Sequence, residues 1–190
     1  MGHLHGERIT LREYRYEDLS YMREWVNDHE VTGTLYDNFL YPQTDTETES
    51  FLNAMVDGKT DRKGFIISLR DTLEYIGQID LNAIDWRNRA ASLGIVIGRK
   101  EYHGQGYGRE AIGLLQQFVF DTLNLNRLHL DVYEFNQRAF RCYLSCGFVE
   151  EGRLRKRLFR DGRYWDVIQM SILKDEWEQQ KSAEEREAAQ

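Results

Sequence analysis

The sequence predicts a mixed α/β (α+β) fold around a mixed sheet. Strand-like stretches with alternating apolar and polar residues occur early, in the middle and at the end of the chain. A strand, a glycine-rich loop, a helix and a strand follow one another in the centre, which predicts a parallel crossover. The length of 190 residues fits one domain, placed at 1–175, with 176–190 as a charged helix or tail.

The N-terminal third predicts two strands and two helices. Apolar residues alternate over 9–14, and a short apolar run covers 64–69, so both stretches read as strands. Apolar residues recur at helical spacing over 19–26 and again over 46–56. Between these helices, 34–43 is rich in aromatic residues and holds the only proline, which favours a loop.

The middle of the chain predicts the centre of the sheet. Regular alternation over 78–83 indicates a half-buried strand, and the polar stretch 86–89 indicates a turn. The next strand, 92–97, carries small residues on one face, which leaves room beside the sheet. An amphipathic helix over 111–123 and a strand over 128–132 complete the crossover.

The C-terminal part predicts a helix and a hairpin. A helix over 136–146 should end at Gly147, because glycine readily adopts the left-handed conformation of a helix cap. The stretches 148–159 and 164–173 are strands joined around Asp161-Gly162, a dipeptide typical of hairpin turns.

Composition narrows the class of protein. Hydrophobic residues make up 41% and charged residues 30%, as in globular proteins, and the net charge of −7 disfavours nucleic acid as a partner. No apolar run is long enough to span a bilayer, and the N-terminus lacks the apolar core of a secretion signal. We therefore expect a cytoplasmic protein. Cys142 and Cys146 predict neither a disulfide nor a metal site.

The stretch 95–111 is the most informative part of the sequence. Gly104, Gly106 and Gly108 lie between a strand and a helix, where backbone N–H groups and the helix dipole can hold a pyrophosphate. A nucleotide P-loop is excluded because Gly108 is followed by Arg109 rather than by lysine. A dinucleotide fingerprint is excluded because it needs glycine or alanine at 109.

These residues resemble the acetyl-CoA signature of the GNAT acetyltransferases, Arg/Gln-x-x-Gly-x-Gly/Ala, with His103 in the first position. A second GNAT pattern, N-x-x-A-x-x-x-Y-x-x-x-G-F, runs without a gap from Asn136 to Phe148. The resemblance covers about 9–173. It is closest to the branch of ribosomal-protein-alanine and spermidine acetyltransferases, through 76–98 and 159–173.

The resemblance implies a mostly antiparallel sheet of about seven strands with a splayed parallel pair, flanked by about four helices. It implies acetyl-CoA as cosubstrate and no metal. Tyr143 would be the catalytic acid that protonates the departing thiolate. The residues expected to bind the coenzyme are Ile95, Val96, Ile97, His103, Gly104, Gln105, Gly106, Tyr107, Gly108, Arg109, Asn136 and Ala139.

The catalytic base and the amine acceptor stay open. Asp80, His129, Asp131 or a water chain are candidates for the base. The acceptor is a small amine such as a polyamine or amino sugar, or a protein N-terminus. Acidic residues over 37–49 favour a cationic amine, and the aromatic loop is a candidate pocket wall.

Two further features also have open interpretations. The basic residues over 153–163 favour a solvated hairpin, with an anionic partner as the alternative, and the hairpin could pair across a homodimer. A non-catalytic acyl-CoA-binding protein on the same fold is the alternative to an enzyme.

Overall fold

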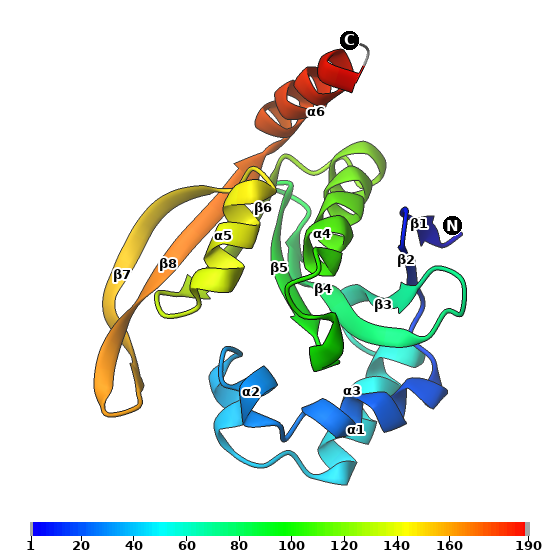
Figure 1. Ribbon diagram of the computed structural model, residues 1–190, viewed down its shortest axis with the longest axis vertical. Coiled ribbons are helices and arrows are strands. Elements are labelled where there is room, and N and C mark those ends of the chain that lie inside the picture. Colours follow the sequence, from blue (N-terminus) through cyan, green and yellow to red (C-terminus); the bar gives the residue numbers. More distant parts are fainter. Residues whose placement is uncertain (1, 189–190) are drawn as a thin grey trace. The chain divides into compact units, whose positions relative to one another are not determined.

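The structure is a computed structural model that describes residues 2–188 (Figure 1). The chain folds into two compact units. The first comprises Met1–Ala83 and Gly94–Leu114, and the second comprises Ile84–Leu93 and Leu115–Gln190. The described residues form an eight-stranded sheet of order β1-β2-β3-β4-β5-β6-β8-β7 with one parallel pair, and six α-helices. The predicted mixed class is confirmed, with eight strands instead of about seven and six α-helices instead of about four.

In the first unit, the early strands pair antiparallel. β2 (Ile9–Arg12) pairs with β3 (Lys63–Leu69), and β3 pairs with β4 (Tyr75–Asp85). A two-residue strand, β1 (Leu4–His5), adds to β2. The sequence does not predict β1, because two residues are too few to show an alternating pattern. The strands β4 and β5 (Ala90–Ile97) contribute residues to both units.

The two main helices of the first unit, α1 (Leu19–Trp25) and α3 (Asp45–Val56), lie side by side as Figure 1 shows, and both were predicted. α3 begins with a capping box in which Thr44 and Glu47 bond reciprocally. The other helical segments before β3 are short. They are η1 (Tyr16–Asp18), α2 (His29–Thr32) and η2 (Asp37–Leu40), the last of which lies inside the stretch predicted as a loop.

The polar face of β4 is buried, which corrects the prediction of a half-buried strand. Gln78 and Asp80 are only 7% and 5% exposed. A hydrophobic cluster of the same unit contains Tyr14, Met22, Trp25, Val26, Val31, Leu52, Ile66 and Tyr75. Two polar side chains of β4 therefore lie in an apolar interior, where each requires hydrogen-bond partners.

Helix α4 (Tyr107–Gln117) begins earlier than predicted. Its amphipathic pattern starts at Ala111, because the first turn holds glycine and charged residues, yet the backbone is already helical at Tyr107. A π-helical stretch, η4 (Phe118–Thr122), continues it. The preceding loop contains a single 3₁₀ turn, η3 (Lys100–Tyr102), so the glycine-rich loop ends at a helix N-terminus.

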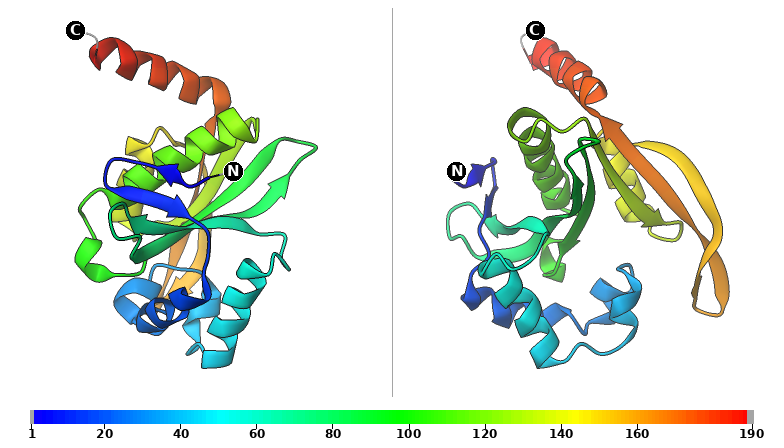
Figure 2. Two further views of the ribbon diagram at one scale, coloured as in Figure 1. Left: turned by 90° about the vertical axis from the view of Figure 1, so that its right-hand side faces the viewer. Right: turned by 180° about the vertical axis from the view of Figure 1, so that it is seen from behind.

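In the second unit, β6 (Arg127–Tyr133) has a parallel and an antiparallel partner. Ala90–Ser92 of β5 pairs with β6 in parallel, as the predicted crossover requires. β8 (Arg163–Leu173) pairs with β6 antiparallel. β8 and β7 (Val149–Arg160) form the predicted long hairpin, the paired orange strands of Figure 2.

The second unit also contains the last two helices. α5 (Gln137–Ser145) starts directly after Asn136, and Gly147 follows it in the left-handed region at φ 84°, as predicted. The C-terminal segment was predicted to be a charged helix or a tail. Its described residues are helical and form α6 (Lys174–Ala188).

The described residues were also compared with the expectations for membrane spans, metal sites and disulfides. No described helix is both long enough and apolar enough to cross a membrane. The described residues contain no group of three or more His, Cys, Asp or Glu that could hold a metal ion. Cys142 is half-buried and Cys146 buried, and both are free thiols.

Candidate active site

The first unit contains a pocket of about 360 Å³, here called the Asp80 pocket. Its walls come from α1, the aromatic stretch before α3, α3 itself, Arg62 and the strands β4 and β5. The apolar lining residues are Met22, Trp25, Val26, Leu35, Tyr36, Phe39, Phe51, Ile95 and Val96. The aromatic stretch therefore forms part of a pocket wall, although Tyr41 within it is 78% exposed.

The most deeply buried acidic group of the pocket is the carboxylate of Asp80. The hydroxyl of Tyr14 donates a hydrogen bond of 2.5 Å to its Oδ1 atom. On the other side, Gln78 Nε2 lies 3.5 Å and Arg62 Nη1 lies 4.0 Å from its Oδ2 atom. Asp80 is thus held by named partners while it lines a pocket.

Burial raises the pKa of Asp80 from 3.8 to about 6, because the apolar surroundings disfavour the charged form. The hydrogen bond from Tyr14, the charge of Arg62 and the hydrogen bond from Gln78 act in the opposite direction and lower the pKa. A carboxyl group with this pKa is mostly ionised at pH 7 and accepts a proton more readily than an ordinary aspartate.

Gly64 on the neighbouring strand allows this position of the carboxylate. A Cβ atom at Gly64 would lie 1.9 Å from Oδ1 of Asp80 and 3.0 Å from the backbone oxygen of Ile79. Any side chain at 64 would therefore displace the carboxylate from Tyr14. In the sequence alone, Gly64 is only the first residue of a predicted apolar strand.

A second buried chain of hydrogen bonds supports Gln78. Trp25 Nε1 donates to the hydroxyl of Tyr75 at 2.9 Å, and that hydroxyl donates to Gln78 Oε1 at 3.5 Å. Because Gln78 in turn faces Asp80, hydrogen bonds connect the side chains of Trp25, Tyr75, Gln78, Asp80 and Tyr14 into one network.

The predicted coenzyme loop lies in the same unit, after β5. Gly104 and Gly106 have φ angles of 73° and 86°, which side-chain-bearing residues rarely adopt. A Cβ atom at Gly104 would meet nothing within 4 Å, so the loop faces open space there. The residues of this loop fit a ligand that is bound through backbone amides.

The helix after the loop adds further donors. The N–H group of Glu110 donates a hydrogen bond to the carbonyl oxygen of Gly106 at 3.1 Å. The N–H groups that precede it in the first turn have no carbonyl acceptor within the helix. Such an N-terminus favours an anion. Both features of the predicted pyrophosphate cradle are therefore present in the first unit.

His103 replaces the arginine or glutamine of the family pattern and has a structural contact. Its Nε2 atom lies 2.8 Å from the carbonyl oxygen of Ile97, so Nε2 carries the proton and donates. This bond ties the loop to the end of β5, the strand expected to bind pantetheine.

The remaining predicted residues lie in the second unit, on α5 and at its N-cap. Oδ1 of Asn136 accepts a hydrogen bond of 3.2 Å from the backbone N–H of Ala139 and so caps the helix. Tyr143 is 9% exposed, and its ring packs edge-on against Phe148 with 5.9 Å between centroids. These contacts position both residues, and their roles toward the coenzyme stay predictions.

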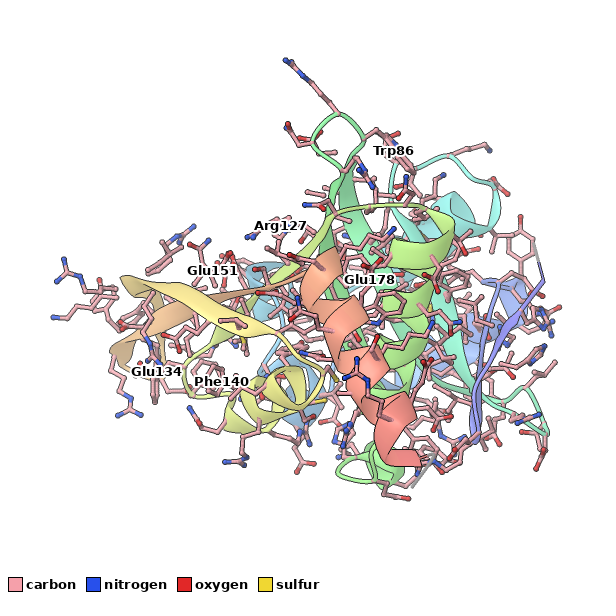
Figure 3. The ribbon with its side chains drawn as sticks, turned by 90° about the horizontal axis from the view of Figure 1, so that it is seen from above. Trp86, Arg127, Glu134, Phe140, Glu151 and Glu178 are labelled. Carbon is pink, nitrogen blue, oxygen red and sulfur yellow. The ribbon has the colours of Figure 1, made fainter. Side chains whose placement is uncertain are left out.

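The two other candidate bases lie on β6 in the second unit. His129 is half-buried, and its pKa is lowered by burial and by the charge of Arg127. Arg127 forms an ion pair with Glu151, and Figure 3 labels both residues. Asp131 is exposed. Neither residue combines burial with a polar hydrogen-bond network as Asp80 does.

The basic hairpin differs in part from the predicted solvated surface. Most of its cations are exposed, but Arg160 is only 8% exposed. Its guanidinium lies 5.4 Å from the ring centre of Tyr133 and 5.7 Å from that of Phe135. Arg160 is therefore part of a packed cation–π cluster of the second unit.

Comparisons with known proteins identify the family. The profile of the acetyltransferase (GNAT) domain matches residues 8–149. The spermidine N(1)-acetyltransferase of Vibrio cholerae is 31% identical over 172 residues, which cover 90% of this chain and 96% of the relative. The putative ribosomal N-acetyltransferase YdaF of Bacillus subtilis is 29% identical, covering 93% and 97%.

A solved structure agrees in both fold and sequence. Spermidine N-acetyltransferase from Vibrio cholerae in complex with CoA and spermine matches with a TM-score of 0.81 and 28% identity, over 90% of this chain and 99% of that one. The predicted family and branch are thus confirmed. The chain belongs to the GNAT acetyltransferase family and is an N-acetyltransferase that uses acetyl-CoA as its acetyl donor.

Proposed function

We propose that this N-acetyltransferase acetylates a primary amine of a polyamine, which binds in the Asp80 pocket. The observation that carries the proposal is the buried carboxylate among apolar and aromatic walls. Methylene chains suit such walls, and ammonium groups suit carboxylates, of which Glu47 is a second in the lining. The relatives support this acceptor, since one is a spermidine acetyltransferase and one structure contains spermine.

In this proposal Asp80 is the general base. A primary alkylamine with a pKa of about 10 is protonated at neutral pH, so it must lose a proton before its nitrogen can attack. The carboxylate of Asp80 lines the pocket and has a pKa of about 6. It attracts the ammonium group and then takes its proton.

The coenzyme is held by backbone groups. The amides of residues 103–109 and of the α4 N-terminus bind the pyrophosphate, and residues 95–97 of β5 bond the pantetheine arm. In the second unit, Asn136 and Ala139 are the further residues that we propose bind the coenzyme. The proposed catalytic domain comprises residues 1–175.

The reaction is a direct transfer. The free amine attacks the thioester carbonyl carbon, so that a C–N bond forms and the C–S bond breaks. Asp80 holds the proton taken from the ammonium group before the attack, and the phenol of Tyr143 gives a proton to the departing thiolate. The second proton, which the nitrogen loses as the amide forms, returns to the Tyr143 phenolate through solvent. The products are an N-acetyl amine and free CoA, without a covalent enzyme intermediate.

The experiment that tests the acceptor measures release of free thiol from acetyl-CoA. The panel contains spermidine, spermine, amino sugars, aminoglycosides and peptides with N-terminal alanine or serine. We expect the highest kcat/KM with a polyamine and little response to the amino sugars. A preference for the peptides would overturn the polyamine proposal and leave the activity itself intact.

A lack of thiol release with every amine of the panel would lead to a different conclusion. If CoA binds, as measured by calorimetry, while no amine is acetylated, the non-catalytic coenzyme-binding alternative replaces the proposed function. An inactive chain that also fails to bind CoA would contradict the proposed coenzyme site as well.

Tyr14→Phe should shift the pH dependence of acetylation. The Tyr14 hydroxyl stabilises the charged form of Asp80, so its removal raises the pKa of Asp80 above about 6. Activity needs the ionised carboxylate, so the acidic limb of the kcat/KM profile should move to higher pH by roughly one unit.

A matched control is Tyr16→Phe. The Tyr16 hydroxyl also donates to an aspartate, at 2.7 Å, but that aspartate is Asp57 outside the Asp80 pocket. Its pH profile should match that of the unmodified enzyme. Identical profiles for both variants would exclude Asp80 as the group that titrates in the acidic limb.

A further inference from the structure

A salt-bridged cluster joins the N-terminal segment to the predicted coenzyme loop within the first unit. Arg8 Nη1 donates to the carbonyl oxygen of Gln105 at 2.9 Å, and Arg8 Nε donates to Glu110 Oε2 at 3.0 Å. The guanidinium also lies 4.5 Å from the ring centre of Tyr107. Arg8 thus contacts Gln105 of the loop, and Tyr107 and Glu110 in the first turn of α4.

Glu110 anchors this cluster from the helix. Its Oε1 atom accepts hydrogen bonds from the backbone N–H groups of Arg8, at 2.8 Å, and of Ile9, at 3.3 Å. Gly6 permits the close approach, because a Cβ atom there would lie 2.4 Å from the same oxygen. Both the backbone and the side chain of Arg8 are therefore fixed by one carboxylate.

The contact with Gln105 has a consequence for the amide that follows. The carbonyl of Gln105 and the N–H of Gly106 belong to one planar trans peptide unit, so they point in opposite directions. An arginine that holds the carbonyl on one side of the loop therefore holds the Gly106 N–H toward the other side. Gly106 has a φ angle of 86°, and glycine tolerates both orientations of the neighbouring peptide, so an external contact is needed to select one.

We propose that Arg8 is a positioning residue for acetyl-CoA binding. It holds the Gln105–Gly106 peptide so that the Gly106 amide faces the pyrophosphate, and Glu110 keeps Arg8 in place. The inference rests on the proposed coenzyme loop. It adds a residue outside both GNAT sequence patterns, about a hundred positions away in the chain, to the groups that shape this loop.

The test uses Arg8→Met and a matched control, Arg70→Met. Methionine keeps an unbranched side chain over Tyr107 and removes the donors. Arg70 ties down the same N-terminal segment, since its Nη1 donates to the carbonyl oxygens of Gly6 at 2.7 Å and Glu7 at 3.5 Å rather than to the loop. Both variants lose one positive charge, so their long-range attraction for the anionic coenzyme falls alike.

We expect the Kd for CoA, measured by calorimetry, to rise roughly tenfold in Arg8→Met and to change little in Arg70→Met. The KM for acetyl-CoA should rise in parallel, with kcat and the KM for the amine nearly constant. With S-acetylpantetheine as donor, which lacks the pyrophosphate, Arg8→Met and the control should have equal kcat/KM. Arg8→Lys should bind CoA more tightly than Arg8→Met, because lysine can still donate to the Gln105 carbonyl.

The outcomes separate the inference from the proposed function. If the unmodified enzyme binds CoA and both methionine variants bind it equally well, the positioning role is wrong and the coenzyme loop stands. A loss of rate that is the same with acetyl-CoA and with S-acetylpantetheine would also overturn the inference, since it would show a general structural effect. If the unmodified enzyme binds no CoA, the proposed coenzyme site itself is refuted.

Discussion

Asp80→Asn should lower kcat/KM for the amine at pH 7 by about three orders of magnitude, the scale of a lost general base. Asparagine has nearly the same shape, so its Oδ1 atom can still accept the hydrogen bond from Tyr14. It cannot take a proton from the bound amine. The free-thiol assay measures the loss, with Asp85→Asn as a control that removes an exposed carboxylate from the same strand.

The pH dependence of the acetylation rate distinguishes a variant that lacks the general base from one whose pocket is deformed. In Asp80→Asn the rate should climb as pH approaches the pKa of the amine, because the acceptor then arrives already deprotonated. A variant damaged only in its pocket geometry would stay slow at every pH. An Asp80→Asn enzyme with the rate of Asp85→Asn would assign the base to His129, Asp131 or water.

Asp80→Asn should also increase the free energy of unfolding at pH 7. The folded-state pKa of Asp80 is raised from 3.8 to about 6, so the folded state binds the proton more tightly than the unfolded state does. The contribution of Asp80 to the free energy of unfolding therefore falls as pH rises from about 4 to about 6. Asparagine lacks this ionisation, and thermal unfolding at pH 5 and pH 7 should show the difference.

Tyr143→Phe should lower the acetylation rate on the order of a hundredfold, with the Kd for CoA little changed. The substitution removes the phenolic proton but keeps the ring that packs against Phe148. Thiol release and calorimetry measure the two quantities. Tyr164→Phe is the control, because Tyr164 is a 62% exposed residue of the hairpin in the same unit.

The dependence on the leaving group makes this prediction specific. An acid catalyst matters less when the departing thiolate is less basic, so a thioester with a more acidic thiol should narrow the difference between Tyr143→Phe and the unmodified enzyme. A constant ratio across such thioesters would remove Tyr143 from the role of acid and leave it as a packing residue.

Local patterns were sufficient for most elements and for the family. The hairpin turn follows from Asp161 and Gly162, whose φ angles of 53° and 76° are those that this dipeptide tolerates. The ends of α5 follow in the same way from Asn136, which caps the helix, and from Gly147, which leaves it. Each of these features depends on residues within one or two turns of the chain, so the sequence predicts it directly.

The coenzyme signature is also local. The glycine-rich loop and the start of α4 are contiguous in the chain, so a pattern of a few letters predicts that a glycine loop leads into a helix. Only the start of α4 was misplaced, because helix formation at Tyr107 depends on backbone geometry after Gly106, whereas the amphipathic pattern starts at Ala111.

The chemistry of the proposed acceptor site depends on the tertiary structure. Asp80 alternates with apolar residues as any half-exposed strand residue does, and its burial, its raised pKa and its bond to Tyr14, 66 positions away, arise only when the first unit packs. The contact between Arg8 and Glu110 joins residues 102 positions apart. Periodicity reports the neighbours of a residue along the chain, whereas a pKa and a hydrogen-bond partner depend on neighbours in space.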